Sequence, residues 1–125
     1  MTNRDDNQTP DHLAYSVKKI QAFAQGDQTS LRLILDSFIQ STRQNLQEFE
    51  NLLSERHRND LAELAHKMRS MFLQLDATGL AQHLYELEEN RLNDKQWRET
   101  AEVALRQAKE LVKTIQADYQ LNNTP

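Results

Sequence analysis

His66 is the residue of this sequence best placed to do chemistry, because it stands apart from the apolar residues around it. Apolar side chains recur at spacings of three and four over residues 60–75, and this pattern predicts an amphipathic helix. The apolar face of that helix comprises Leu61, Leu64, Ala65, Met68, Phe72 and Leu75. At about 100° per residue, His66 lies about 200° around the helix from Met68 and is therefore expected to point toward solvent.

The neighbours of His66 indicate what its ring could do. Arg69 and Ser70 follow it by three and four residues, so they share its outer face. A neutral imidazole keeps a lone pair on one ring nitrogen, and this lone pair can attack phosphorus. Arg69 can offset the negative charge of a phosphoryl group, and Lys67 can assist as a point charge. The small side chain of Ser70 leaves room for a phosphodonor to approach.

Other chemistries fit the sequence less well. Glu63 and His66 form one Glu-x-x-His element, but di-iron bundles need two such elements facing inward, and His66 is expected to point outward. His83 has Leu80 where a second element requires glutamate. The chain also lacks a Gly-rich phosphate loop and a nucleophile elbow. We therefore expect no metal site, no cofactor of its own and no independent ATP-dependent activity.

The composition limits the fold class and the kinds of partner. The 125 residues include 15 Lys and Arg, 19 Asp and Glu, two glycines, two prolines and no cysteine. Few helix breakers and many strong helix formers predict an all-helical single domain. A net charge of −4 argues against a nucleic-acid module, which needs a concentrated basic surface. No apolar run approaches the ~18 residues of a membrane span, so we expect a cytoplasmic protein without direct membrane contact.

Apolar stripes and breakers divide the chain into five expected helices. We expect residues 1–10 to form a flexible tail or linker end, residues 11–120 a helical bundle, and residues 121–125 a frayed C-terminus. Because the links are short, the second to fifth helices should form an antiparallel up-down four-helix bundle, with the first helix capping one end. The residues expected to cap helices are Asp11 for the first, Asp27 for the second, Asn59 or Asp60 for the third, and Asn93 or Asp94 for the fifth.

The residues around His66 resemble the histidine-containing phosphotransfer (HPt) domains of multistep two-component signalling. The segments that carry the resemblance are Ala65-His66-Lys67-Met68-Arg69-Ser70, Leu75-Asp76-Ala77 and Leu84-x-x-Leu87-Glu88. The family pattern is Ala-His-x-Leu-Lys-Gly-Ser, then Leu-Gly-Ala, then a Leu…Leu-Glu segment. This resemblance implies that His66 is the phosphorylated histidine and that Arg69 matches the family's basic residue. Ser70 and Asp76 stand where the family usually has glycine.

Glu88 is a candidate orienting residue for His66. If the third and fourth helices pair antiparallel about a turn centred near Ala77, Glu88 occupies the mirror position of His66. Its carboxylate could then bond the non-reacting ring nitrogen and fix the tautomer. The alternative is a solvated glutamate that pairs with Arg91 or Lys67.

Together these features predict a phosphorelay intermediate. His66 would accept a phosphoryl group from a receiver-domain aspartate and pass it to another receiver. Ala62 and Leu73 would form an apolar docking patch, although the first helix could instead cover Leu73. The expected partners are response-regulator receivers, which would carry the Mg²⁺. The domain is expected to be monomeric, and it could belong to a hybrid sensor histidine kinase. The alternatives are a helical interaction or scaffolding module, and a degenerate HPt domain that docks receivers without transfer.

Overall fold

The computed structural model describes residues 13–121, which form five α-helices and no β-strand. The helices are α1 (Lys18–Phe23), α2 (Gln28–Ser54), α3 (Arg58–Leu73), α4 (Thr78–Glu89) and α5 (Asp94–Tyr119). The expected all-α class and the number of helices are confirmed. The expected tail, residues 1–10, and residues 122–125 lie outside the described part of the chain. No helix between residues 13 and 121 is long and apolar enough to cross a membrane.

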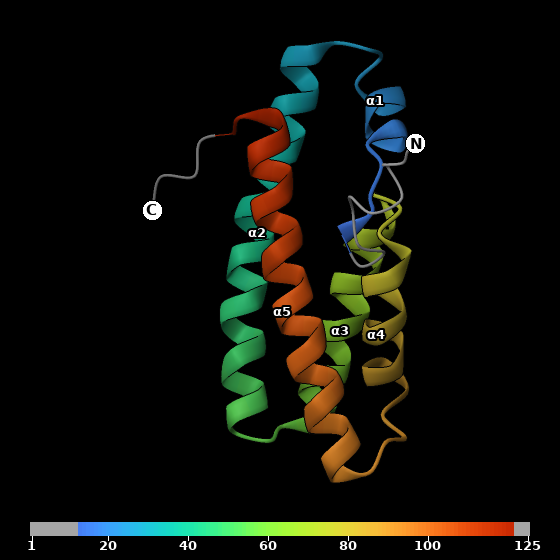
Figure 1. Ribbon diagram of the computed structural model, residues 1–125, viewed down its shortest axis with the longest axis vertical. Helices are drawn as coiled ribbons and strands as arrows, with labels where there is room; N and C mark the ends of the chain where they lie inside the picture. The colour runs from blue at the N-terminus through green and yellow to red at the C-terminus, as the bar shows by residue number, and fades with distance from the viewer. Residues whose placement is uncertain (1–12, 122–125) are drawn as a thin grey trace, which may run out of the picture.

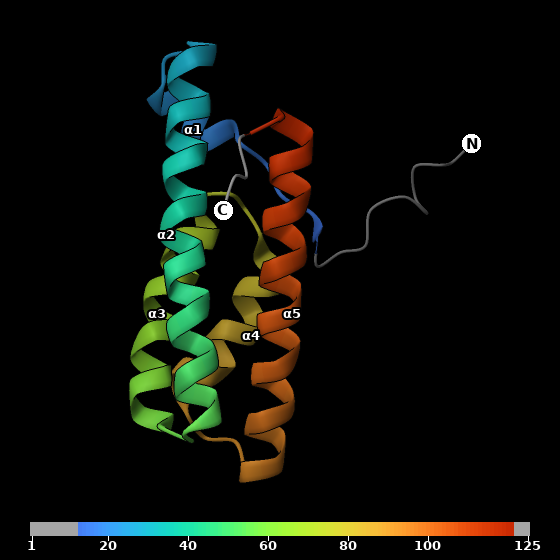
Figure 2. The same ribbon diagram turned by 90° about the vertical axis from the view of Figure 1, so that its left-hand side faces the viewer.

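Helices α2 to α5 form the expected antiparallel up-down bundle (Figure 1). Each of them packs against two others: α2 and α4 both lie between α3 and α5. The helices α2 and α5 are the longest, and in Figure 2 both extend beyond the connection between α3 and α4. The bundle therefore has one end at which the shorter α3–α4 hairpin leaves apolar side chains of α2 and α5 to be covered.

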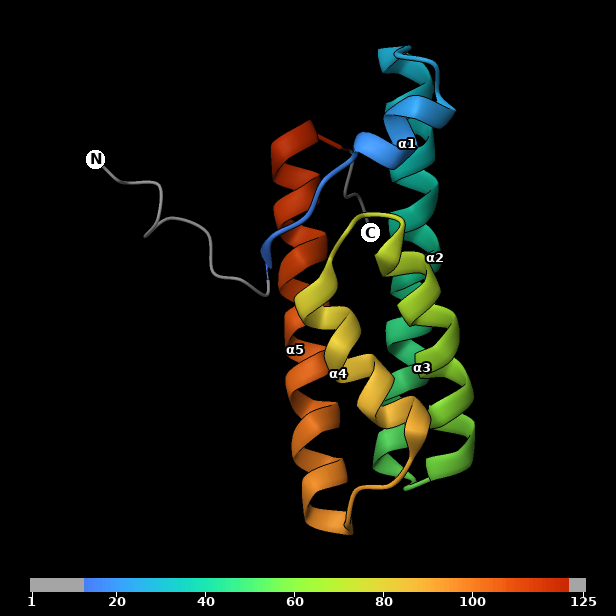
Figure 3. The ribbon, with the colours of Figure 1, turned by 90° about the vertical axis from the view of Figure 1, so that its right-hand side faces the viewer.

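The short helix α1 covers this end, as expected from the sequence (Figure 3). The segment before it is fixed by a hydrogen bond of 2.7 Å from the backbone N–H of Ser16 to the carbonyl oxygen of Leu75. The hydroxyl of Tyr15 also donates to Asp118 on α5 at 2.6 Å. These contacts draw the backbone before Lys18 across the bundle, so α1 begins there, well after the expected cap Asp11, which lies outside the described residues.

The apolar stripes that define the helices in the sequence form the core. All six apolar residues expected on the inner face of the third helix are buried. Phe38 of α2 and Phe72 of α3 meet edge to face, with ring centroids 5.4 Å apart. Phe49 and Phe72 are almost fully buried, and truncating such a side chain to alanine typically costs about 3–5 kcal/mol.

Two of the expected caps are confirmed and one is wrong. The Asp27 side chain accepts from the backbone N–H of Ser30, and Asn93 forms a reciprocal capping box with Gln96. Helix α3 instead begins at Arg58, after His57, whose side chain makes no capping bond. The expected cap Asn59 is used elsewhere, because its Oδ1 accepts a hydrogen bond of 3.1 Å from Asn90.

The turn before α4 and the end of α5 are both ordered. Helix α4 begins at Thr78, so Gly79 lies inside its first turn. The residue with left-handed backbone is Asp76, with φ 52°, and its carboxylate pairs with Lys19 of α1 at 3.1 Å. Leu121, expected in a frayed C-terminus, is buried, and its N–H donates to the carbonyl of Gln116.

Candidate functional site

His66 lies on the outer face of α3, opposite the helix's buried stripe. Its side chain is 60 % exposed, whereas Ala65 and Met68 on the inner face are fully covered. Ser70, one turn further along α3, is also exposed. The ring is therefore accessible to a second protein, as its position in the amphipathic pattern predicts.

A carboxylate from α4 holds one nitrogen of this ring. The Nδ1 atom of His66 lies 2.8 Å from Oε2 of Glu88. Because α3 and α4 form an antiparallel hairpin, the two residues face each other at the same height. The alternative pairing of Glu88 is wrong: Arg91 pairs with Glu89, and Lys67 forms no ion pair within residues 13–121.

Arg69 completes this cluster through the second oxygen of the same carboxylate. Its Nε donates to Oε1 of Glu88 at 2.8 Å, and its guanidinium carbon lies 5.3 Å from the centre of the Tyr85 ring. About a quarter of the Arg69 side chain is exposed. One carboxylate thus bridges an exposed imidazole and a guanidinium, and the guanidinium makes a cation–π contact with an aromatic ring.

The charge on Glu88 decides which ring nitrogen of His66 is free to react. The hydrogen bond from Arg69 holds the pKa of Glu88 below its ordinary value; burial opposes this shift and the bond with His66 adds to it. The carboxylate is therefore ionised at neutral pH and can only accept hydrogen bonds. For a neutral ring, the network assigns the proton to Nδ1 and leaves the lone pair on Nε2.

Lys67 lies away from this cluster. It lines a hollow of about 310 Å³ between α2 and α3, which also includes Glu48 and Asp60. The consecutive positions of Lys67 and His66 put their side chains about 100° apart on the helix. The structure therefore brings together His66, Arg69 and Glu88 among the predicted site residues, keeps Ser70 exposed beside them, and leaves Lys67 on another side of α3.

Tyr85 is a member of the cluster that the sequence analysis missed. Its side chain is 41 % exposed although it is large and mostly apolar. The signal that could have identified it is its position three residues before Glu88, which places both on one face of α4. The expected docking residues Ala62 and Leu73 are both half-buried, and the carbonyl oxygen of Leu73 accepts from Lys19 of α1 at 3.1 Å.

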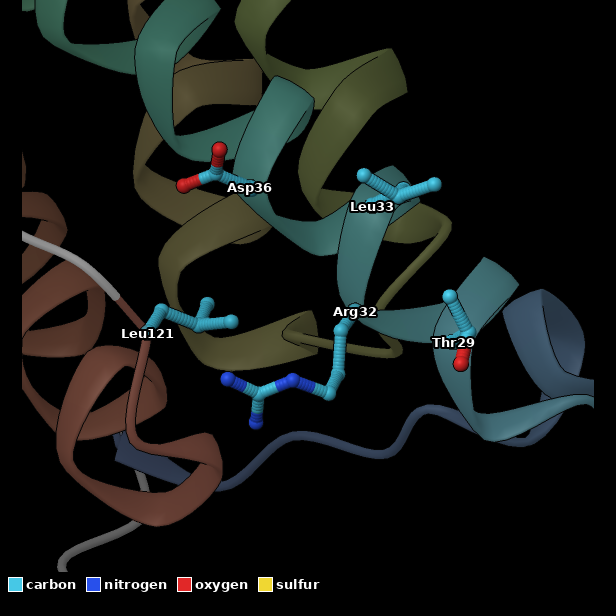
Figure 4. Close-up of a pocket in the computed structure, with 5 residues that line it drawn as sticks. All are labelled: Thr29, Arg32, Leu33, Asp36 and Leu121. Carbon is cyan, nitrogen blue, oxygen red and sulfur yellow. The ribbon is translucent and has the colours of Figure 1, made fainter.

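Within the described residues, the other two histidines, His57 and His83, show no comparable arrangement. Between residues 13 and 121, no three His, Asp or Glu side chains are grouped so as to hold a metal ion. His57 is exposed beside Glu55, and His83 is half-buried. Figure 4 shows Arg32 reaching from α2 toward the end of α5, where its guanidinium donates to the carbonyl oxygens of Tyr119 and Gln120.

One protein family matches this chain. The sequence model described as the Hpt domain matches residues 33–118, which is more than half of the chain and spans most of α2 and all of α3 and α4. The chain belongs to the Hpt family. Hpt domains carry out histidine phosphotransfer in two-component phosphorelays and interact with the receiver domains of response regulators. Comparison with curated proteins and with solved structures found no match.

Proposed function

We propose that this Hpt domain accepts a phosphoryl group on Nε2 of His66 from a receiver-domain aspartyl phosphate and transfers it to the aspartate of another receiver. The observation that carries the proposal is the exposed His66 ring whose Nδ1 is held by Glu88. Localisation in the cytoplasm, a monomeric state and origin in a hybrid sensor kinase belong to the same proposal.

The transfer step exchanges one bond to phosphorus for another. The Nε2 lone pair of His66 attacks phosphorus while the bond from phosphorus to the receiver's aspartate oxygen breaks. The electron pair of that bond leaves with the aspartate as a carboxylate. The ring, still protonated at Nδ1, becomes a phosphorylated imidazolium, and the reverse sequence transfers the group to the next receiver.

The residues around the ring have distinct parts in this step. The carboxylate of Glu88 keeps the proton on Nδ1 and stabilises the positive charge that the ring gains. Arg69 offsets the charge of the phosphoryl oxygens, and the small side chain of Ser70 leaves space for the receiver. Lys67 contributes as a more distant point charge. The receiver would supply the Mg²⁺ that balances the charge of the transferring group.

The receiver would approach along α3 toward the α1 end of the bundle. An apolar hollow of about 360 Å³ lies there between α1, α2 and α3. The hollow is bordered by Phe23, whose side chain is almost wholly exposed, and by Gln74, which lies eight residues beyond His66 on α3. Eight residues advance an α-helix by about 12 Å and turn it by about 80°, a separation that the surface of one receiver domain can span. Ala62 and the side chain of Leu73 would extend the same contact.

Transfer from a phosphorylated receiver to the intact chain tests this proposal. We expect ³²P label to reach the wild type and His57→Gln, a matched control at another exposed histidine, but not His66→Gln. Label on His66→Gln at the wild-type level would refute the role of His66. Absence of label from the wild type with a panel of receivers would favour the scaffolding module instead.

A further inference from the structure

Tyr85 has an unusual environment for a large side chain on the surface of a helical bundle. It is 41 % exposed and contributes little to the core, yet its ring lies against the guanidinium of Arg69 at 5.3 Å. It belongs to α4, as Glu88 does, and Glu88 binds the same guanidinium through its Nε. Two residues of one helix face therefore hold Arg69 from two directions.

The way Arg69 is held leaves part of its guanidinium available. Its Nε donates to Glu88, and its guanidinium carbon lies over the Tyr85 ring. Within residues 13–121, Nη1 and Nη2 donate to no protein group, so four N–H donors remain. Glu88 binds the imidazole of His66 through Oε2 and Arg69 through Oε1, so one carboxylate joins the guanidinium to the reactive side chain.

A lysine could not be held in this way. An ammonium group has no plane to stack on a ring and no separate Nε, whereas a guanidinium can stack, bind a carboxylate and donate to a phosphoryl group at once. A phosphoryl group on His66 adds a charge of about −1.5 to −2 near neutral pH and three acceptor oxygens. The orientation of Arg69 therefore decides how well its donors meet those oxygens.

We propose that Tyr85 is a positioning residue of the phosphotransfer site, whose ring keeps the Arg69 guanidinium beside the phosphoryl group on Nε2 of His66. This inference rests on the proposed function of His66 and adds to it the residue that orients the cation. Without the ring, Arg69 keeps its bond to Glu88 but can rotate its free donors into water.

The test measures the second acid dissociation of the phosphoryl group on His66 by ³¹P NMR. Phosphoramidate, a small chemical donor, phosphorylates the protein without a receiver, and the His66 resonance is identified by its absence in His66→Gln. The positive charge of Arg69 favours the doubly ionised phosphoryl group, and so it increases the second acid dissociation constant of that group. Tyr85→Leu should decrease that constant by about two- to fivefold, the range expected for an exposed cation–π contact. Tyr85→Phe, which keeps the ring, should retain the wild-type value.

A double-mutant comparison separates positioning from a general structural effect. In Arg69→Gln, adding Tyr85→Leu should leave the dissociation constant unchanged, because the cation that Tyr85 contacts is already absent. Thermal unfolding of each variant identifies any loss of folded protein. The inference would be overturned if Tyr85→Leu kept the wild-type dissociation constant. It would also be overturned if Tyr85→Leu changed the constant equally in the chain with Arg69 and in Arg69→Gln. Failure of receiver transfer alone would overturn the proposed relay, because the phosphoramidate measurement needs no receiver.

Discussion

His66 and Glu88 are 22 positions apart in the chain and are joined by a contact of 2.8 Å between the ring Nδ1 and the carboxylate Oε2. The residue midway between them is Ala77, the N-cap of α4. The α3–α4 hairpin thus brings the two residues to the same level. The same carboxylate also binds Arg69, so one contact across the hairpin sets both the ring tautomer and the position of a cation.

Replacing Glu88 by glutamine should slow phosphotransfer without removing it. The amide keeps the size of the side chain but lacks the charge that holds the proton on Nδ1 and stabilises the phosphorylated ring. We expect the transfer rate constant to fall by about tenfold, the lower end of the loss that follows removal of an orienting partner. ¹⁵N NMR of the His66 ring should show a larger share of the other tautomer. The control Glu89→Gln, which alters the neighbouring exposed carboxylate, should match the wild type; an equal loss there would contradict this role.

The contribution of Glu88 to stability should depend on pH in one direction. Its pKa is lower in the folded than in the unfolded protein, mainly because Arg69 donates to it. The stabilisation is therefore present above the unfolded value of about 4.3 and is lost as pH falls through the lower folded value. Urea unfolding of the wild type and Glu88→Gln between pH 7 and pH 3.5 measures it. The difference between them should stay below about 1 kcal/mol and shrink at the acidic end; a difference that grows there would contradict the assignment.

The size of the side chain at Ser70 should control receiver access more than stability. Ser70→Gly should lower the free energy of unfolding by about 0.5 kcal/mol, because glycine is a poorer helix former, while transfer persists. Ser70→Tyr should fold normally but slow transfer by about tenfold or more, since a bulky group displaces the incoming phosphoryl group. A transfer rate of Ser70→Tyr equal to that of the wild type would refute the steric role of this position. Transfer that appears only in Ser70→Gly would identify a degenerate domain.

Arg58 should stabilise the end of the bundle farthest from α1. Its guanidinium donates to Asn90, Asp94 and the carbonyl oxygen of Leu92, and it lies over the ring of Trp97 at 5.2 Å. Arg58→Ala removes these bonds from a side chain that is 25 % exposed, so we expect a loss of about 2 kcal/mol in the free energy of unfolding.

The matched control for Arg58 is Arg98→Ala, on the exposed side of α5. Urea unfolding should show a change within about 0.5 kcal/mol for this control. The transfer rate of folded Arg58→Ala should equal that of the wild type, because Arg58 has no contact with the His66 cluster. Equal stability of the two variants would show that the contacts of Arg58 contribute nothing.

Much of the fold could be predicted because each helix carries its own signal. The buried residues of α3 are five of the six that recur at helical spacing, and the sixth, Leu75, is buried just after the helix ends. The caps Asp27 and Asn93 act locally on residues three positions later. The facing positions of His66 and Glu88 followed from the symmetry of a hairpin. These features need only the helix period and a short connection between neighbouring helices.

The wrong expectations concern residues whose partners are distant in the sequence. The start of α1 depends on the bond from Ser16 to Leu75, and the loss of the expected cap at Asn59 depends on its bond with Asn90. None of these partners is indicated by the local pattern around the residue concerned.

The sequence by itself determined that the chain is helical, which face of each helix is buried, and that His66 is turned away from the core. These properties follow from the spacing of apolar residues along single helices. Only the tertiary structure decided that Glu88 binds the ring and Arg69 together and that Tyr85 lies against the guanidinium. The height at which α3 and α4 pack, and their rotation about their own axes, fix those contacts, and both depend on the packing of all four bundle helices.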